Sequence, residues 1–345
     1  MSLLPATYTA ESVTSGHPDK ICDAIADSIL DSCLQQDSES RVAVECFGSH
    51  GQLFIGGEVT TQAHVDYKTI AQHLYSAIGY EDNLDITVAV AEQSSDIADG
   101  IKDDGAGDQG IMYGYACNST EEFLPLGVVL AHKLTQRLEF VRRQGVLPWL
   151  RPDGKAQVTI SNGRVVAVVV STQHSSGISL EELRAQIIQY IVEPLIDVSA
   201  VKSIYINPAG TFTIGGFAAD SGLTGRKIMV DTYGGVVVHG GGSFSGKDAS
   251  KVDRSGAYMA RYAAKSIVSQ GNAKECLVSV AYAIGKKEPV MLMAVNENGE
   301  DIQEIHSFDF KPKSIISHLG LLRPIFGRTS NYGHFGKNIY PWENV

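Results

Sequence analysis

The structural pattern of this chain is first spelled out in residues 18–59, PDKICDAIADSILDSCLQQDSESRVAVECFGSHGQLFIGGEV. Pro18 suits the first turn of a helix, and apolar residues keep one face of residues 19–35 hydrophobic, which predicts an amphipathic helix. Strand-like runs follow at residues 41–47 and 53–59, and a glycine-bounded turn separates them. The stretch therefore predicts a helix followed by two strands.

The same order of elements recurs along the chain. The first unit is completed by a helix at about 65–78 and a strand at 85–91. The second unit has a helix at 125–144, strands at 157–160 and 164–171 around the hairpin signal Ser161–Asn162–Gly163, a helix at 180–192 and a strand at 201–207. The third unit has a helix at 254–269, strands at 276–284 and 289–295, and a short helix at 313–321. Three α-β-β-α units predict an α+β fold with an internal threefold repeat. We expect domains at about 1–100, 101–213 and 214–345.

The composition excludes several classes of protein. The chain has 345 residues, of which 43% are hydrophobic and 19% charged, as in a folded protein. Its net charge of −11 argues against general nucleic-acid binding, which normally leaves a basic surface. No apolar run approaches the roughly 20 residues that span a membrane, and the start of the chain has no signal-peptide pattern. The five cysteines form no C-x-x-C pair, so we expect reduced thiols, no structural zinc and a cytoplasmic location.

Glycine is enriched, at 35 residues. Two stretches are loops by composition: 94–110, which has almost no apolar residues, and 233–251, which is dense in glycine and carries two lysines. Gly241 to Lys247 spells G-x-x-x-x-G-K, but the next residue is Asp248 where a P-loop needs Ser or Thr. Backbone N–H groups and nearby lysines could still hold a polyphosphate, with Asp253 as a magnesium ligand. The alternative is a flexible surface turn.

The sequence GAGDQG at 105–110 matches the dinucleotide fingerprint G-x-G-x-x-G but stands in the wrong context. An acidic loop precedes it and a strand-like run, 111–116, follows it, whereas the fingerprint needs a preceding strand and a following helix. We therefore reject dinucleotide binding. A mobile lid over about 94–107 is one interpretation, and an unstructured loop is the other.

Other charged residues are ambiguous from spacing alone. The start of the first helix, Ser15–Lys20, combines a histidine, a carboxylate and a lysine at a position that attracts anions. Because aspartates then recur every four residues to Asp31, spacing favours a solvated acidic face. Residues 151–155 look like a turn that carries a charged lysine; the alternative, favoured when the segment is taken alone, is an exposed approach to the hairpin that follows. Glu45 and Glu58 interrupt apolar strands, so they either bind a cation or ligand amine or lie on the solvent face of a sheet.

Together these segments resemble the S-adenosylmethionine synthetase (methionine adenosyltransferase) family over nearly the whole chain. The resemblance is carried by ESVTSGHPDK (11–20), GGEVTT (56–61), GAGDQG (105–110), LPWLRPDGK (147–155), GLTGRKIMVDTYGG (222–235) and HGGGSFSGKDASKVDRS (239–255). It implies three similar α/β domains related by a pseudo-threefold. It also implies that the methionine sulfur attacks C5′ of ATP, and that the tripolyphosphate released is then hydrolysed to pyrophosphate and phosphate.

The resemblance also implies roles for individual residues. The catalytic and polyphosphate-binding residues would be His17, Lys155, Arg226, Lys227 and Lys247, with Asp153, Thr211, Phe212, Asp220 and Ser243 also contacting ATP. Glu58, Gln93, Asp108, Asp220 and Lys251 would surround methionine. Two Mg²⁺ ions per site would be bound by Asp19 and Asp253, and K⁺ by Glu45. The family builds its active sites between two subunits, so we expect self-association into a dimer, or a tetramer built from two dimers.

The chain departs from the family pattern at a few positions. Thr211 stands where Arg is usual, Ser243 where Ala is usual, and the 94–107 loop looks shorter than in typical bacterial members. These departures keep a second function open, that of a catalytically weak regulatory or binding subunit. A third is a phosphotransferase that uses the glycine loop. Formation of S-adenosylmethionine rather than ADP would separate the enzyme from both.

Overall fold

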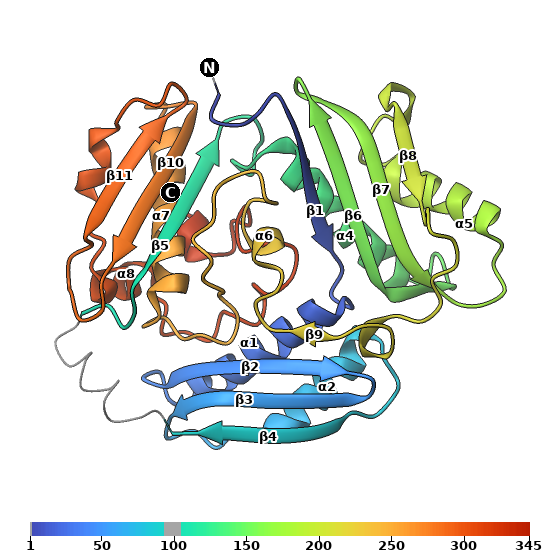
Figure 1. Ribbon diagram of the computed structural model, residues 1–345, viewed down its shortest axis with the longest axis horizontal. Coiled ribbons are helices and arrows are strands. Elements are labelled where there is room, and N and C mark those ends of the chain that lie inside the picture. Colours follow the sequence, from blue (N-terminus) through green and yellow to red (C-terminus); the bar gives the residue numbers. More distant parts are fainter. Residues whose placement is uncertain (1, 93–104) are drawn as a thin grey trace.

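A computed structural model describes residues 2–92 and 105–345 of the chain. Three separate sheets lie around the middle of the molecule, each with its own helices (Figure 1). The first unit is built around β2 and β3, the central unit around β6 and β7, and the third unit around β10 and β11. Gln93 and most of the expected 94–107 lid lie outside the described residues.

The elements follow the predicted order closely. They are β1 (Thr7–Val13), α1 (Pro18–Gln36), β2 (Arg41–Ser49), β3 (Gln52–Thr60), α2 (Tyr67–Ile78), β4 (Asp85–Ala91), β5 (Gly110–Cys117), α4 (Leu126–Arg143), β6 (Leu150–Ser161), β7 (Arg164–His174), α5 (Leu180–Ile187), β8 (Ser203–Ile206), β9 (Gly222–Leu223), α6 (Ile228–Asp231), α7 (Val252–Ser269), β10 (Glu275–Tyr282), β11 (Met291–Asn296) and α8 (Pro312–Leu319). The three α-β-β-α units are confirmed.

Each sheet repeats one arrangement of strands. A hairpin forms its centre, and the first hairpin strand pairs antiparallel with a strand from another part of the chain: β9 beside β2, β1 beside β6, and β5 beside β10. In the first and central sheets, a last strand then pairs parallel with the second hairpin strand, as β4 does with β3 and β8 with β7. The units are therefore tied together by exchanged strands.

Local signals explain several of these elements. Asn162 and Gly163 both have positive φ, 47° and 75°, as the hairpin signal between β6 and β7 requires. Pro18 opens α1, and Gly320 in the left-handed region ends α8. The predicted helix 180–192 is α5 followed by one π-helical turn, Ile188–Val192.

Residues 151–155 form no turn; they approach the hairpin as the favoured alternative has it, but residues 152–154 are buried rather than exposed. These residues belong to strand β6, which pairs with β7 through an irregular register between Leu150 and Gly154 and with β1 on its other edge. The sequence resembles a turn because Pro, Asp and Gly stand together, yet Gly154 and Lys155 pair with β7, and Lys155 also pairs with Val13 of β1. As a result, Lys155 projects from a strand rather than from a loop.

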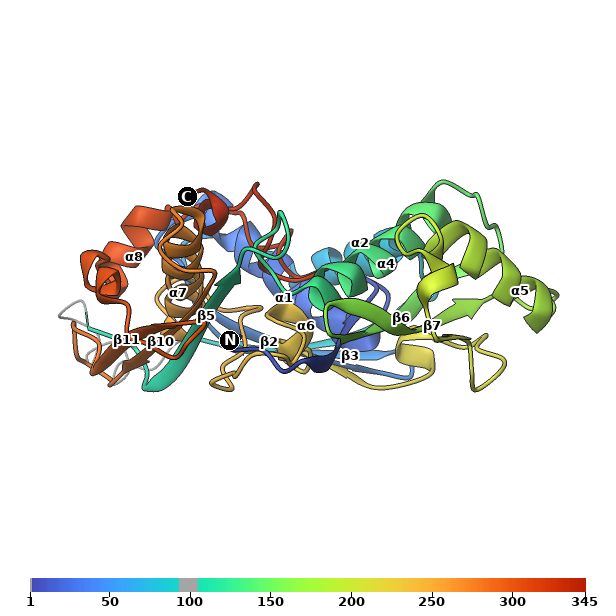
Figure 2. The same ribbon diagram turned by 90° about the horizontal axis from the view of Figure 1, so that it is seen from above.

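The helices lie on one side of the sheets and leave the other side uncovered (Figure 2). In β2, Val42, Val44 and Cys46 are buried toward the helices, and the alternating residues face outward. Two large apolar side chains, Phe47 and Phe54, are 47% and 45% exposed and lie directly opposite each other on this outer face. The chain thus presents an apolar sheet surface to its surroundings.

Two hydrophobic cores hold the helices to the sheets. One joins the first and third units, and the other fills the central unit. All five cysteines are buried and unpaired. Among residues 2–92 and 105–345, none of the helices has the length and apolar composition needed to cross a membrane.

Candidate active site

The candidate residues gather at two places along strand β2. At one, β9 pairs with Phe47 and Gly48 and brings the segment 222–227 to the start of α1; we call this the Asp19 end. At the other, Lys247 forms an isolated bridge with Ala43; we call this the Asp253 end. Four residues of a strand separate the two anchor points, a length of about 13 Å.

At the Asp19 end, one buried carboxylate collects several donors. The Lys227 ammonium lies 2.6 Å from Oδ2 of Asp19, and the Nε of Arg226 lies 3.5 Å from Oδ1. The backbone N–H of Leu223 donates to the same Oδ1 at 3.0 Å. The Asp19 side chain is only 2% exposed, so it is a desolvated anion that a lysine neutralises. His17 precedes it as the N-cap of α1 and accepts from the N–H of Asp19.

His17 is held in its neutral form. Burial, followed by the positive charges of Lys227 and Lys155, lowers its pKa to about 2. Its ring is therefore a neutral hydrogen-bonding group near a cluster of cations, and it carries no charge of its own at physiological pH. The influence of Lys155, 138 residues away in sequence, shows that the structure brings these two candidates together.

Close backbone packing holds the segment before α1, residues 14–17, against residues 152–155 of β6. Gly16 lies so near Pro152 that a Cβ there would come within 2.5 Å of the proline backbone. Thr14 donates its hydroxyl to the Pro152 carbonyl at 2.6 Å. Asp153 is buried and accepts from the N–H of Gly216 at 2.9 Å, and burial raises its pKa to about 6. Lys155 is exposed at the same edge.

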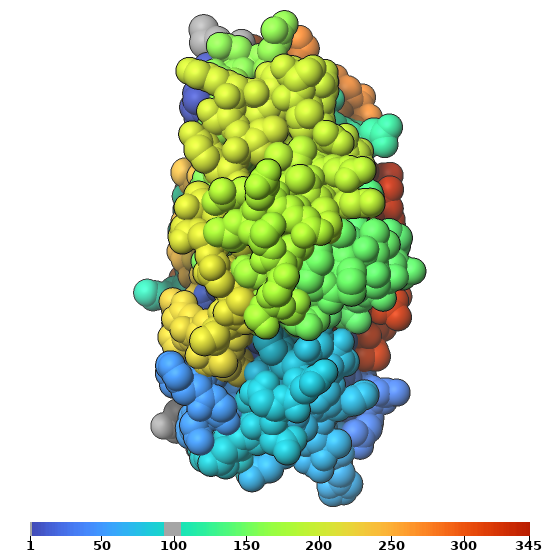
Figure 3. Space-filling view, turned by 90° about the vertical axis from the view of Figure 1, so that its right-hand side faces the viewer, coloured from blue at the N-terminus to red at the C-terminus, as the bar shows by residue number. Residues whose placement is uncertain are grey.

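The expected adenine-side residues lie on the segment 207–221, which crosses the surface where the central and first units meet (Figure 3). Phe212 is half-buried and is held to His174 by two hydrogen bonds, one from its own N–H to the ring Nε2 and one from the N–H of His174. Thr211 and Asp220 are exposed on the same segment. The segment leads directly into β9, which pairs with β2 at the Asp19 end.

The Asp253 end repeats the lysine–carboxylate pair in another setting. The Lys247 ammonium donates to Oδ2 of Asp253 at 2.6 Å, and the two side chains are 22% and 18% exposed. A Cβ on Gly242 would lie 2.3 Å from the carboxylate, so the glycine loop approaches Asp253 more closely than any other residue type would allow. Ser243 of the same loop lies close to Gly225, since a Cβ on Gly225 would come within 2.6 Å of the Ser243 side chain.

Asp248 explains why the loop departs from a P-loop. It is buried and accepts from the N–H of Val42 and from the Lys251 ammonium, and although burial opposes its charge, Lys251 lowers its pKa. The residue after Lys247 thus anchors the loop to β2 instead of contacting a metal through a hydroxyl. Lys251, expected near methionine, is paired with Asp248.

The remaining candidates lie on or near the outer face of the sheets. Glu45 and Glu58 alternate with buried residues of β2 and β3; Glu45 is exposed and Glu58 half-buried. Within a single chain, both carboxylates therefore lie on the solvent face of the sheet, the second of the two alternatives that the sequence left open. Asp108 is exposed, two residues before Gly110, whose own Cβ position lies 3.6 Å from Asp253. Gln93 lies outside the described residues.

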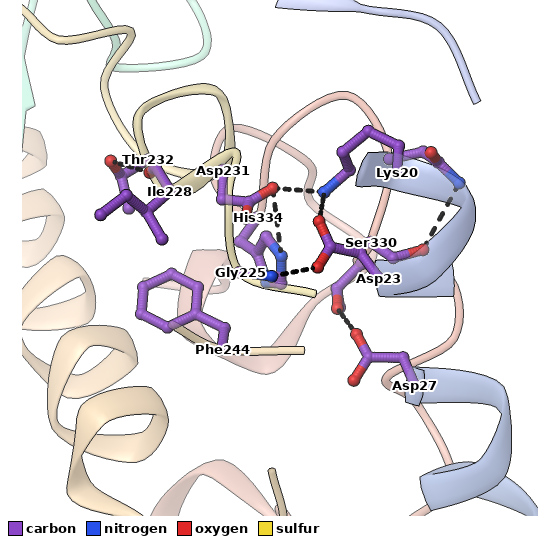
Figure 4. A network of polar contacts seen from close by, with 12 residues as sticks. Lys20, Asp23, Asp27, Gly225, Ile228, Asp231, Thr232, Phe244, Ser330 and His334 are labelled. Atoms are coloured by element: carbon purple, nitrogen blue, oxygen red, sulfur yellow. Dashed lines mark hydrogen bonds and ion pairs between the residues drawn. The ribbon is translucent and has the colours of Figure 1, made fainter. Parts of the chain in front are cut away.

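The solvated acidic face expected on α1 is wrong. Asp19, Asp23 and Asp27 are all buried, because each faces a partner from another part of the chain. Figure 4 shows Asp23 beside Lys20 and Gly225. Arg254 donates two hydrogen bonds to Asp27, and Lys20 lies between Asp23 and Asp231. Sequence reasoning noted the lysine at the start of α1 but missed Asp231 and its pairing with Lys20, because nothing local marks a partner 211 residues away.

This arrangement suits a polyanion. Lysines, an arginine and glycine-loop N–H groups surround two carboxylates, each of which already binds an ammonium that a phosphate could attract away. No group of three or more His, Cys, Asp or Glu side chains in the described part of the chain could hold a metal by itself. Single carboxylates are nevertheless sufficient for Mg²⁺, which is usually bound through one or two carboxylates together with substrate phosphates.

Comparisons with known proteins point the same way. The chain matches the N-terminal, central and C-terminal domains of S-adenosylmethionine synthetase over residues 5–102, 103–212 and 214–344. It is 46% identical to the S-adenosylmethionine synthases of Brachyspira hyodysenteriae, Desulforudis audaxviator and Thermus thermophilus, over 98% of this chain and 95% of each relative.

Proposed function

The chain belongs to the S-adenosylmethionine synthetase family, and from this premise we propose how its own residues carry the reaction. It is a methionine adenosyltransferase and synthesises S-adenosylmethionine from ATP and L-methionine. The observation that carries the assignment of residues is the pair of lysine–carboxylate contacts, Lys227–Asp19 and Lys247–Asp253, both 2.6 Å long.

The chemistry needs alignment and charge stabilisation more than proton transfer. A thioether sulfur is nucleophilic without losing a proton, so its attack on C5′ of ATP requires no general base. The barrier falls when the sulfur and C5′ are held in line and when the negative charge gathering on the tripolyphosphate is stabilised. We assign that stabilisation to Lys155, Arg226, Lys227 and Lys247, and a neutral hydrogen bond near the leaving oxygen to His17. Asp153 and Ser243 complete the contacts with ATP.

The two lysine–carboxylate pairs suggest how the site is loaded. As ATP binds, Lys227 and Lys247 leave Asp19 and Asp253 and turn to the phosphates, so that both carboxylates become available to a cation. The donor set fits one Mg²⁺ at each carboxylate, since each offers oxygen ligands beside the phosphate-binding lysines. Bound Mg²⁺ would supply further neutralisation of charge on the leaving polyphosphate.

The other substrate contacts follow the same two ends. Phe212 offers a ring face for adenine, with Thr211 and Asp220 beside it on an exposed segment. Asp108 and Lys251 lie at the Asp253 end, and we assign them to methionine together with Glu58, Asp220 and Gln93. Glu45, whose carboxylate is exposed on the outer face of β2, is the proposed K⁺ ligand.

We expect the complete site to need two chains. The apolar outer face around Phe47 and Phe54 also carries Glu45 and Glu58. A second chain packed on this face would bury both carboxylates beside the site residues of that second chain. A twofold axis through this face would bring the Asp19 end of one chain to the Asp253 end of the other. The assembly is a dimer, or a tetramer made from two dimers. The five unpaired, buried cysteines are compatible with a cytoplasmic location, which we also propose.

One assay tests the function. Purified protein is incubated with ATP, methionine, Mg²⁺ and K⁺, and S-adenosylmethionine, pyrophosphate, phosphate and ADP are measured. The proposal requires S-adenosylmethionine together with equal amounts of pyrophosphate and phosphate. Absence of S-adenosylmethionine at high protein concentration would overturn it, and ADP formation would instead indicate a phosphotransferase.

A further inference from the structure

The segment 225–231 carries two of the proposed phosphate-binding residues, Arg226 and Lys227, and both of its ends are tied to α1. At its start, the N–H of Gly225 donates to Oδ1 of Asp23 at 2.8 Å. At its end, Oδ1 of Asp231 lies 2.5 Å from the ammonium of Lys20. That ammonium also lies 2.9 Å from Asp23, so one lysine joins both attachments (Figure 4).

These three side chains are charged groups in the interior of the protein. Lys20 and Asp23 have no exposed side-chain surface, and Asp231 is 2% exposed. Two carboxylates share one ammonium, and burial raises the pKa of Asp231 to about 7. Well-packed apolar residues usually stabilise a protein as much as a buried ion cluster does. Stability alone is therefore a weak reason for this cluster.

The location of the cluster supplies a better reason. Lys20 and Asp23 stand in the first turns of α1, directly after Asp19, and Asp231 ends the short helix that follows Lys227. The C-terminal segment supports the same point, since the N–H of His334 donates to the Asp231 carbonyl at 2.8 Å. Arg226 and Lys227 are thus held between two fixed points on the helix that also presents Asp19.

We propose that Lys20, Asp23 and Asp231 form a clamp that positions Arg226 and Lys227 for the polyphosphate chain. The inference rests on the function proposed above. When ATP is loaded, Lys227 has to leave Asp19, and its backbone then loses one of the contacts that hold it in place. The clamp keeps both ends of the segment fixed during this exchange. The side chains of Arg226 and Lys227 therefore reach the phosphates from one backbone position, and less conformational entropy is lost on binding.

Two isosteric variants test the clamp at its two ends. Asp231→Asn and Asp23→Asn each weaken one attachment. In each variant Lys20 keeps the other carboxylate as an ion-pair partner, so we expect the fold to tolerate the substitution. We expect the Kd for tripolyphosphate, measured by calorimetry without methionine, to rise about tenfold and kcat to fall by a similar factor. The KM for methionine should stay within about twofold, because none of the residues proposed for methionine belongs to the segment 225–231.

A matched control exists in the third unit. Glu343 is a buried carboxylate between Arg261 and Lys265, at 2.9 and 3.0 Å, and none of the three touches the segment 225–231. Glu343→Gln should lower the melting temperature while the Kd for tripolyphosphate stays as in the wild type. The contrast separates positioning from general stabilisation.

The outcomes are distinct. If both aspartate variants bind tripolyphosphate as tightly as the wild type, or if Glu343→Gln weakens binding as much as they do, the clamp is wrong. If Asp231→Asn does not fold, Asp23→Asn alone decides. If the wild type makes no S-adenosylmethionine but the aspartate variants still weaken tripolyphosphate binding selectively, the proposed function fails and the clamp stands.

Discussion

At the Asp19 end, the lysine–carboxylate pair is set at the start of a 19-residue helix, with the carboxylate 2% exposed and a clamp of buried charges behind it. At the Asp253 end, a pair of the same length is set beside a glycine loop, and the carboxylate is 18% exposed. The contacts match, but the scaffolds differ. The first end is fixed by side-chain charges, and the second by the absence of side chains at Gly242 and its neighbours.

The two ends should therefore be sensitive to different kinds of substitution. A change of charge should be most harmful at the Asp19 end, because desolvation strengthens every ionic contact there. A change of shape should be most harmful at the Asp253 end, where the backbone lies against the carboxylate.

The largest effect is expected for Asp19→Asn. It removes the partner of Lys227 and Arg226 together with the proposed metal ligand, so kcat/KM should fall about a thousandfold, equivalent to about 4 kcal/mol. Asp253→Asn, in a more solvated setting, should lose about a hundredfold. Steady-state kinetics at saturating Mg²⁺ would measure both. Equal losses would remove the distinction between the ends.

Lys155→Met tests a charge that acts on the polyphosphate without supporting the fold. Lys155 is exposed and makes no ion pair within the described residues, so the melting temperature should change by no more than a few degrees. Because its charge is felt mainly as the leaving group becomes more negative, kcat should fall about a hundredfold. Turnover close to that of the wild type would show that Lys155 does not act at the leaving group.

Gly242→Ala tests the shape of the Asp253 end. The added methyl would lie 2.3 Å from the Asp253 carboxylate, which must move, and we expect kcat/KM to fall about thirtyfold. Gly235→Ala is the control in the same loop: its Cβ meets nothing within 4 Å, and its positive φ of 80° should cost about 1 kcal/mol of stability only. Equal losses of activity in the two variants would mean that contact with Asp253 is not the cause.

The smallest effect is a pH dependence of stability at His17. Its folded pKa, about 2, lies below that of the unfolded chain, so the unfolded state binds more protons as the pH falls below about 6.5 and stability is lost in that direction. Between pH 7.5 and 5.5 the loss should be about 1.4 kcal/mol, and His17→Asn should abolish this part of it. Urea unfolding at the two pH values measures the difference. An unchanged pH dependence in the variant would mean that His17 titrates normally.

Local patterns were sufficient for much of the fold. The strand at 85–91 and the hairpin at Asn162–Gly163 are where periodicity and turn chemistry place them, because both depend on neighbours in sequence. Strand β1 was missed, since its exposed threonines and glutamate follow no clear apolar run and its partner β6 is about 150 residues away. The pairing of β9, β1 and β5 with the sheets of other units could not be predicted from local sequence for the same reason.

The site shows the same limit more clearly. Asp19 and Lys227 form one contact across 208 residues, and only the likeness of whole motifs to a known family placed them in one site. Spacing alone assigned the α1 aspartates to solvent. It failed because a buried carboxylate depends on cations that the tertiary fold supplies, and those cations leave no trace in the helix itself.

We propose that the Asp19 end of one chain works with the Asp253 end of another, and mixing two inactive variants distinguishes this from a site built within one chain. Lys155→Met and Lys247→Met are unfolded together and refolded as a mixture, and S-adenosylmethionine formation is compared with that of each variant refolded alone. If the ends come from different chains, mixed dimers contain one intact site, and random reassociation should restore about a quarter of wild-type activity. Activity no greater than that of the separate variants, in a mixture shown to contain mixed dimers, would contradict the account.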